Sequence, residues 1–510
     1  MDTSNEHEKT NQVLPKQNVY GPIETQSGPG LTRFCILCGI IAAIAPFQFG
    51  YKMAELNNPK ESIINCSTAS STSDFNWSFP KCLPMSEDYF ALATSIFALG
   101  GLLGSFFAGY LSDRFGRKKI LLFNSLIFFV GATIQAFSLK SSVLIFGRFV
   151  SGISSGTAIV VTPIYLTEIA PIQSRGTLNL FNQMSIVIGV LMAQIIGYAF
   201  GTGNRWRMVF IISMLLSLVN FATSFFLVES PKHLYQKGKS DEAESILKRL
   251  RGTNDVKQEL ESWKINSENN IISPDSEERL GMDNGAHTAS PDTVNYTPEK
   301  NINLFSIFGI PKYRQPLFLV FCLQLGQQFS GVNSVIFYST SILSDIYSKE
   351  TSSKLTLILG SVSVFSTIFA VIIVDKVERK KLLLSSIIGM FLSMLIFVIA
   401  LFKEINVLVV VGLFMVLASF APGYGTLPFL ISTELFDTKA VGAGNSVSIA
   451  TNWIGTFIIG VTFFAIQKAI GYYVFVVYMG FMAIFAAIYM IYLPETKNKS
   501  FQVVSKEFVF

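Results

Sequence analysis

The chain has 510 residues, of which 50% are hydrophobic and only 14% are charged, and its formal net charge is +5. Soluble domains carry about 25% charged residues, so a mean hydropathy of +0.47 over this length excludes a single soluble core. Five cysteines do not make a disulfide scaffold. The three histidines lie outside the apolar segments, so we expect no catalytic residues, no metal site and no cofactor.

Twelve apolar segments are each long enough for a membrane-spanning helix, which needs about 20 residues. They lie at 33–54, 88–111, 120–139, 143–167, 177–200, 206–228, 315–345, 354–374, 382–402, 406–433, 441–467 and 471–493. We predict an all-α membrane protein with two six-helix bundles. Its parts are a tail at 1–32, a bundle at 33–228, a linker at 229–312, a second bundle at 313–493 and a tail at 494–510.

The charged turn at Asp113–Lys119, after the second segment, has a weaker copy at Asp375–Lys381, after the eighth. A repeated charged turn at matching places indicates a duplicated helical bundle, as in many carriers. The polar first 33 residues contain three prolines and do not resemble a cleavable signal peptide. In the linker, Ser240–Leu250 predicts a short amphipathic helix, and 266–300 predicts a disordered insert.

Lysine and arginine gather in the two charged turns and in the linker, whereas the opposite loops hold one or two each. Basic loops stay on the cytoplasmic side, so both termini are predicted to be cytoplasmic and the loop from about residue 55 to 87 external. That loop contains two glycosylation sequons, at Asn65 and Asn76. It also contains Cys66 and Cys82, the one credible disulfide pair.

Six motifs occur in the order typical of one transporter family. They are Gly109–Lys118, Pro163–Pro171 followed by Arg175 and Gly176, Glu229–Lys232, Gln324–Asn333, Phe337–Ile342 and Pro494–Thr496. Together they resemble the sugar porter family of the major facilitator superfamily, and within it the animal facilitative glucose transporters. The resemblance implies two pseudo-symmetric bundles and alternating access at the plasma membrane.

A sugar needs amides and hydroxyls for its own hydroxyls, and aromatic rings for its ring faces. The candidate substrate-binding residues are the amides Gln183, Gln327, Gln328, Asn333 and Asn452 with the aromatics Tyr338, Phe429 and Trp453. Polar residues in membrane helices more often hydrogen-bond neighbouring helices, but the Gln327–Gln328 pair followed by Asn333 favours ligand contact. Prolines and glycines at 422–428, and Gly331, predict broken helices beside the site.

The resemblance also implies a cytoplasmic salt-bridge set that latches the outward-open form. Its members are Asp113, Arg117, Arg148, Glu168 and Arg175 in the first half and Arg379 and Glu434 in the second. Static capping of helix ends is the alternative interpretation for each. Val441 stands where the family has an arginine, which suggests a weaker or rewired latch.

Proton-driven relatives place an aspartate in the first helix directly after a Gly-Tyr pair, where this chain has Lys52. No other Asp or Glu is expected in the middle of a helix, so passive uniport is favoured. Gly326, Ala421 and Phe429 depart from glucose carriers, but Ser339–Ile342 resembles them, and D-glucose is the favoured substrate. A proton-coupled symporter, a carrier of another hexose or polyol, and a sugar sensor remain alternatives. Sugar and lipid bilayer are the expected partners, with no nucleic acid.

Overall fold

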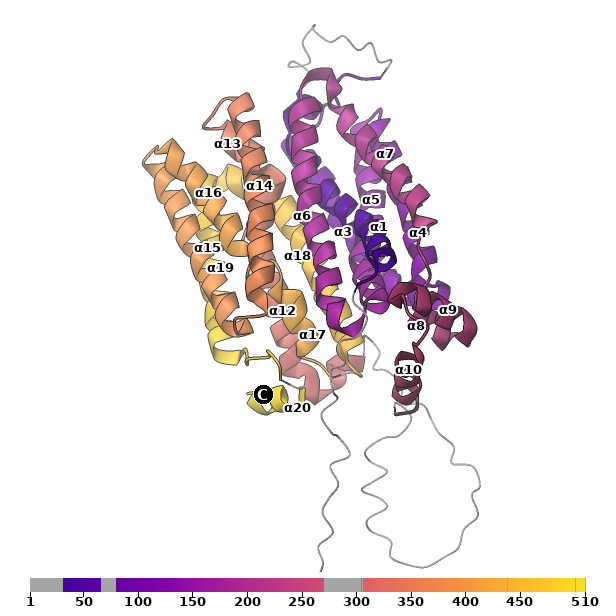
Figure 1. Cartoon of the computed structure of the whole chain (residues 1–510). Helices are drawn as coiled ribbons and strands as arrows, with labels where there is room; N and C mark the ends of the chain where they lie inside the picture. Colours follow the sequence, from indigo (N-terminus) through magenta and orange to yellow (C-terminus); the bar gives the residue numbers. More distant parts are fainter. Residues whose placement is uncertain are drawn as a thin grey trace, which may run out of the picture.

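The computed structural model describes residues 31–65, 79–269, 304, 306–437, 439–499 and 501–509. Its helices form two bundles that lie side by side (Figure 1). The first contains α1 (Arg33–Ala54), α3 (Glu87–Phe115), α4 (Arg117–Ala136), α5 (Ser141–Ile169), α6 (Arg175–Phe200) and α7 (Arg207–Ser224). The second contains α12 (Arg314–Phe329), α13 (Val332–Ser344), α14 (Lys349–Val374), α15 (Arg379–Phe402), α16 (Asn406–Phe420), α17 (Leu427–Glu434), α18 (Val441–Ile470) and α19 (Val474–Tyr492).

Each of the twelve predicted segments is helical. Within the described ranges, nine helices are long and apolar enough to cross a membrane, and the last of these, Val441–Tyr492, contains both α18 and α19. The two remaining segments are broken, one into α12 and α13 and the other into α16 and α17. Gly331 separates α12 from α13 with φ +79°, a left-handed conformation that favours glycine.

The two bundles repeat one arrangement at the charged turns. The Arg117 N–H donates to Glu229 Oε1 at 2.7 Å, and the Arg379 N–H donates to Glu495 Oε1 at 3.0 Å. In each half, a glutamate that follows the last helix of the bundle thus caps the first turn of the helix after the charged turn. The helix dipole favours an anion at this position. The predicted duplication is therefore present at the level of single hydrogen bonds.

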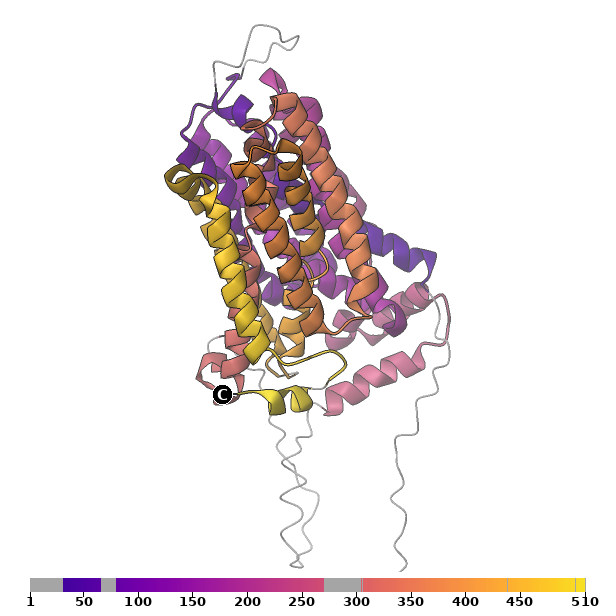
Figure 2. The same ribbon diagram turned by 90° about the vertical axis from the view of Figure 1, so that its left-hand side faces the viewer.

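Short helices cover one end of the two bundles. They are α8 (Pro231–Gln236), α9 (Ser240–Arg251), α10 (Lys257–Asn269) and α20 (Phe501–Val504), and they lie at the same end in both views (Figures 1 and 2). The predicted amphipathic helix is confirmed by α9, which is capped at its C-terminal end by Gly252 with φ +66°. The expected start of the disordered insert is too early, because α10 continues to Asn269. Residues 270–303 lie outside the described ranges.

The loop predicted to leave α1 at residue 55 does not begin in solvent. Glu55, Asn57, Asn58 and Lys60 are all buried, and α2 (Lys60–Ile64) follows them directly. Asn57 and Asn58 are buried because the two bundles meet here, and Glu55 is buried against cations of the first bundle, as the contacts below show. A hydropathy profile cannot distinguish such a packed polar turn from a solvated loop.

Candidate functional site

Four of the five predicted amides form one hydrogen-bonded cluster. Asn452 Nδ2 on α18 donates to Gln327 Oε1 at 2.6 Å, and Gln328 Nε2 donates to the same oxygen at 3.1 Å. Asn333 Nδ2, from the first turn of α13, donates to Gln328 Oε1. The break at Gly331 allows residues before it, on α12, and after it, on α13, to contribute to one site.

Three further polar side chains complete this cluster and were missed from the sequence. Asn452 Nδ2 also donates to Gln324 Oε1 at 2.7 Å, and Gln324 Nε2 donates to Ser448 Oγ at 2.6 Å. Thr456 Oγ1 donates to Gln328 Oε1 at 3.1 Å. The signal was helical spacing, because Ser448, Asn452 and Thr456 are four residues apart and therefore share one face of α18.

Trp453 forms an aromatic wall between the two halves. Its Nε1–H donates to Ser105 Oγ on α3 at 2.8 Å, and its ring meets Phe49 and Phe97 edge-on, with centroids 5.9 and 6.0 Å apart. A Cβ at Gly101 would lie 2.6 Å from the indole, so only glycine allows this approach. Trp453 follows Asn452 on α18, and its ring faces α1 and α3 of the first half.

Among the described contacts, the remaining predicted residues make no hydrogen bond to this cluster. Gln183 on α6 is half-buried, and Phe429 on α17 is partly exposed. Tyr338 stacks on Phe463 at 5.1 Å, and its hydroxyl donates to the Gly460 carbonyl at 3.0 Å. Gly460 lies eight residues after Asn452 on α18, about 12 Å along the helix. The structure thus places Tyr338 towards one end of the bundle.

The two halves are joined at the end opposite α8–α10 by a set of contacts that we call the asparagine clasp. Asn57 Nδ2 donates to Ser339 Oγ at 2.7 Å, and its Oδ1 accepts from the Thr340 N–H at 3.2 Å. Thr340 Oγ1 donates to Asn58 Oδ1 at 2.8 Å. These contacts link the turn after α1 to the C-terminal half of α13, so the two halves are joined at this end of the protein.

At the other end, five of the seven predicted latch residues form one cluster in each half. Arg117 pairs with Glu168 at 2.8 Å and with Asp113 at 2.9 Å. Arg379 lies 3.6 Å from Glu434 and 3.8 Å from Asp375. Arg175 begins α6 in the first half. Among the described residues, no ion pair joins Glu434 to the first half, so the latch across the halves stays a prediction for another conformation.

His233 is an additional member of the Arg117 cluster. Its Nδ1 lies 2.9 Å from Arg117 Nη1. Because arginine can only donate, Nδ1 is the acceptor and the imidazole is neutral. Burial, followed by the charge of Arg117, lowers the pKa of His233 below its ordinary value of 6.5.

Arg148 was wrongly assigned to the latch. It lies in the second turn of α5, whereas Glu168 lies at the other end of the same helix, twenty residues and about 30 Å away. Its guanidinium Nη1 instead lies 2.9 Å from Glu55 Oε1 and donates to the Lys52 carbonyl at 2.6 Å. The helical rise alone excluded Arg148 from a cluster with Glu168.

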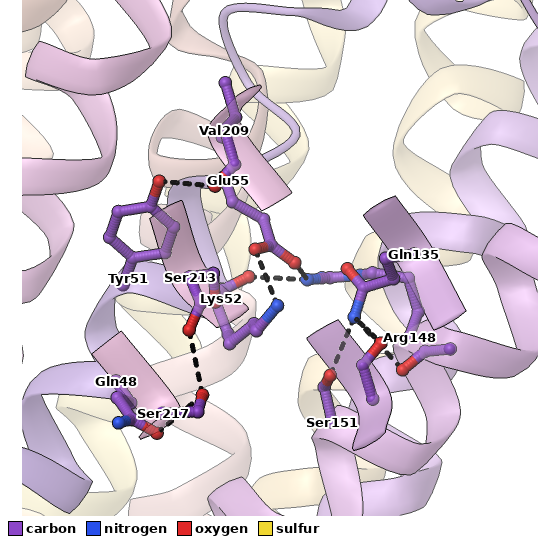
Figure 3. Close-up of polar contacts among 12 residues, drawn as sticks. Gln48, Tyr51, Lys52, Glu55, Gln135, Arg148, Ser151, Val209, Ser213 and Ser217 are labelled. Carbon is purple, nitrogen blue, oxygen red and sulfur yellow. Dashed lines mark hydrogen bonds and ion pairs between the residues drawn. The ribbon is translucent and has the colours of Figure 1, made fainter. Parts of the chain in front are cut away.

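Lys52, Glu55 and Arg148 form a fully buried triad (Figure 3). Lys52 Nζ contacts Glu55 Oε2 at 2.9 Å, so each carboxylate oxygen has its own cation. Arg148 also donates to the carbonyls of Ala93 and Thr94 on α3 at 3.3 Å. The sequence placed Glu55 in the external loop, whereas the structure buries it directly after α1. The three-residue spacing of Lys52 and Glu55 was the signal for it.

The expected external modifications are only partly within the described residues. Asn65 is exposed and follows α2 directly. Cys82 is disulfide-bonded, whereas Cys35, Cys38 and Cys322 are free and buried. Asn76 and Cys66 lie outside the described ranges, so glycosylation and the Cys66–Cys82 pairing stay predictions.

Comparison with known proteins gives consistent results. A family model described as "Sugar (and other) transporter" matches residues 38–508. A probable metabolite transport protein of Saccharomyces cerevisiae is 32% identical, over 96% of this chain and 98% of its own length. The solute carrier family 2 facilitated glucose transporter member 3 of Oryctolagus cuniculus is 31% identical, over 94% and 93%. The vacuolar protein sorting-associated protein 73 of S. cerevisiae is 30% identical, over 96% and 97%.

A solved structure shares the fold. The E. coli xylose transporter XylE, in a partially occluded inward-open conformation, matches with a TM-score of 0.72. The match covers 92% of this chain and 100% of that one, at 20% sequence identity. The fold is therefore that of the major facilitator superfamily.

Proposed function

Because the chain belongs to the sugar (and other) transporter family, we propose that it is a facilitative hexose carrier with D-glucose as its favoured substrate. It is a multi-pass membrane transporter and not an enzyme. The amide cluster of Gln327, Gln328, Asn333 and Asn452 is the observation that carries the proposal. We further propose that it works in the plasma membrane, with both termini in the cytoplasm.

The amide cluster suits a ligand with several hydroxyls. Without sugar, the amides satisfy one another, as Gln327 Oε1 does by accepting from both Asn452 and Gln328. Burying a polar group costs free energy unless it is hydrogen-bonded, so this mutual pairing keeps the empty site stable. A sugar hydroxyl both donates and accepts and can replace either partner of such a bond. The cluster holds no fixed charge, which favours a neutral ligand.

The breaks and the clasp support alternating access. The amide cluster lies beside the break at Gly331, and the asparagine clasp holds α13 about two helical turns beyond that break. Release of the clasp would let α13 bend at Gly331 and expose the cluster from that end. Contacts of the Glu434 latch would then close the opposite end, so that the two ends alternate.

The buried triad supports uniport. A proton carrier must exist in a neutral and a charged form during the cycle. A proton on Glu55 would leave Lys52 and Arg148 buried without a counter-ion, and uncompensated buried charges are costly. We infer that Glu55 keeps its charge and carries no proton. The buried carboxylate itself makes a proton-coupled symporter the second candidate.

Uptake of labelled sugars by proteoliposomes tests this function. We expect D-glucose to enter until its concentrations inside and outside are equal, with L-glucose as the matched control that does not compete. An inward proton gradient should change neither the rate nor the final level. Accumulation above equilibrium in that gradient would establish symport instead, and failure to transport any hexose would exclude the sugar proposal.

A further inference from the structure

We propose that Tyr424 is a positioning residue of the sugar site and that Gly326 provides the space its hydroxyl pair needs. The inference rests on the proposed sugar site at Gln327. It concerns how that amide is oriented, which none of the motifs in the sequence indicates. The argument starts from the break between α16 and α17, where Tyr424 lies.

Tyr424 is fully buried within this break, and its backbone is fixed to α15. The Tyr424 N–H donates to Ser386 Oγ at 3.3 Å, and Ser386 Oγ donates to the Ser419 carbonyl at 2.7 Å. Ser386 therefore joins the last turn of α16 to the non-helical segment that follows it. The break is thus held in one conformation, although it lacks the hydrogen bonds of a continuous helix.

The Tyr424 carbonyl selects one orientation of the Gln327 amide. It accepts a hydrogen bond from Gln327 Nε2. A carbonyl can only accept, so the flipped amide would place two oxygen atoms against each other. On its other side, Gln327 Oε1 faces the donor Nδ2 of Asn452 at 2.6 Å. The contacts with Tyr424 and Asn452 therefore require the same orientation of the Gln327 amide. In this orientation, the second N–H of Gln327 Nε2 is available to donate to a sugar oxygen.

A pair of tyrosine hydroxyls ties the same break to α12 a second time. Tyr424 Oη lies 3.4 Å from Tyr489 Oη on α19, and Tyr489 Oη donates to the Cys322 carbonyl at 2.7 Å. Cys322 lies five residues, about one and a half helical turns, before Gln327 on α12. Tyr424 is thus held to α12 at two levels, and this should prevent the Gln327 amide from turning away from the site.

Gly326 is the residue that makes room for the two hydroxyls. A Cβ at this position would lie 2.4 Å from Tyr489 Oη and 2.7 Å from Tyr424 Oη, closer than real Cβ atoms come. Both tyrosines are fully buried and packed edge to face, with centroids 6.3 Å apart, so neither ring can swing away. Gly326, one of the positions at which the chain departs from glucose carriers, therefore belongs together with Tyr424 and Tyr489.

The test is a set of variants assayed for the KM and the maximal rate of sugar transport. We expect G326A to raise the KM about tenfold while changing the maximal rate less, because the displaced tyrosines release the Gln327 amide. Y424F should raise the KM about threefold. G480A on α19 is the matched control, since no atom lies within 4 Å of its Cβ, and it should behave like the wild type.

The decisive comparison uses the background in which both hydroxyls are removed. In Y424F/Y489F, the further change G326A should alter the KM less than about twofold, because the two hydroxyls that the new Cβ would meet are absent and only the Phe485 ring, at 3.1 Å, stays close to it. The inference is overturned if G326A leaves the wild-type KM, or if it raises the KM equally in both backgrounds. Should G326A alone fail to fold, the comparison of Y424F/Y489F with Y424F/Y489F/G326A still tests the inference, because a large increase in the KM there would contradict it. An unchanged KM in Gln327→Leu would instead refute the sugar site itself.

Discussion

Replacing Glu55 by glutamine removes the carboxylate that lies between two buried cations. Lys52 and Arg148 each contact it at 2.9 Å, and all three side chains are fully buried. Removing one partner of a buried ion pair costs about 3–5 kcal/mol because the other charge is left uncompensated. In a protein with about 5–15 kcal/mol of total stability, Glu55→Gln should therefore be among the most damaging single substitutions.

Lys52→Met provides the matched comparison. It leaves Glu55 and Arg148 as a neutral pair, so we expect a cost of only about 1 kcal/mol. The double variant Lys52→Met/Glu55→Gln should be more stable than Glu55→Gln alone, because one buried cation remains without a counter-ion instead of two. Thermal unfolding of the purified proteins in detergent measures the order. Equal stability of Glu55→Gln and Lys52→Met would refute the account of the triad.

Four further predictions concern the site, the latch, the outer loop and the charged turn. Gln327→Leu should raise the KM for glucose about fivefold to a hundredfold, because about 1–3 kcal/mol is lost for each unpaired sugar hydroxyl; tracer uptake measures this, and an unchanged KM contradicts the assignment. Glu434→Gln should shift the population towards the inward-open form, so a cysteine placed on the cytoplasmic face should label faster; unchanged labelling would mean a static cap. Glycosidase should increase the gel mobility of protein from eukaryotic membranes, and replacing Asn65 and Asn76 together should abolish this shift, whereas a shift that persists would place the glycans elsewhere. The lowered pKa of His233 means that the folded protein binds fewer protons than the unfolded one, so its stability should fall as the pH drops below 6.5; His233→Gln should weaken this dependence, and an unaltered pH profile would exclude the histidine as its source.

The sequence predicted the architecture because membrane crossing imposes a long apolar segment on each helix. It also located the breaks, since Gly331 and the prolines of 422–428 cannot continue a regular helix without a cost. Four of the amides proposed from their side-chain chemistry proved to be neighbours. Gln183 makes no hydrogen bond to this cluster. It lies on α6 in the first half, and the sequence does not show how the two halves are oriented relative to each other.

The misassigned charges have a common physical reason. Arg148 and Glu55 lie on different helices, and the sequence shows neither the depth nor the rotation at which α1 and α5 pack. Hydropathy placed Glu55 in a loop because the apolar segment ends there. The contact of Gly326 with Tyr424 and Tyr489 depends on three helices at once, so no motif within one segment predicts it.

Counterflow of labelled D-glucose in proteoliposomes tests the central claim most directly. Vesicles preloaded with unlabelled glucose are diluted into labelled glucose, with an ionophore present to collapse any proton gradient. A carrier that alternates around one sugar site should accumulate the label transiently above equilibrium, and Gln327→Leu should reduce that overshoot at low sugar concentration. The absence of an overshoot in the wild-type protein, or its loss when the proton gradient is collapsed, would contradict the account.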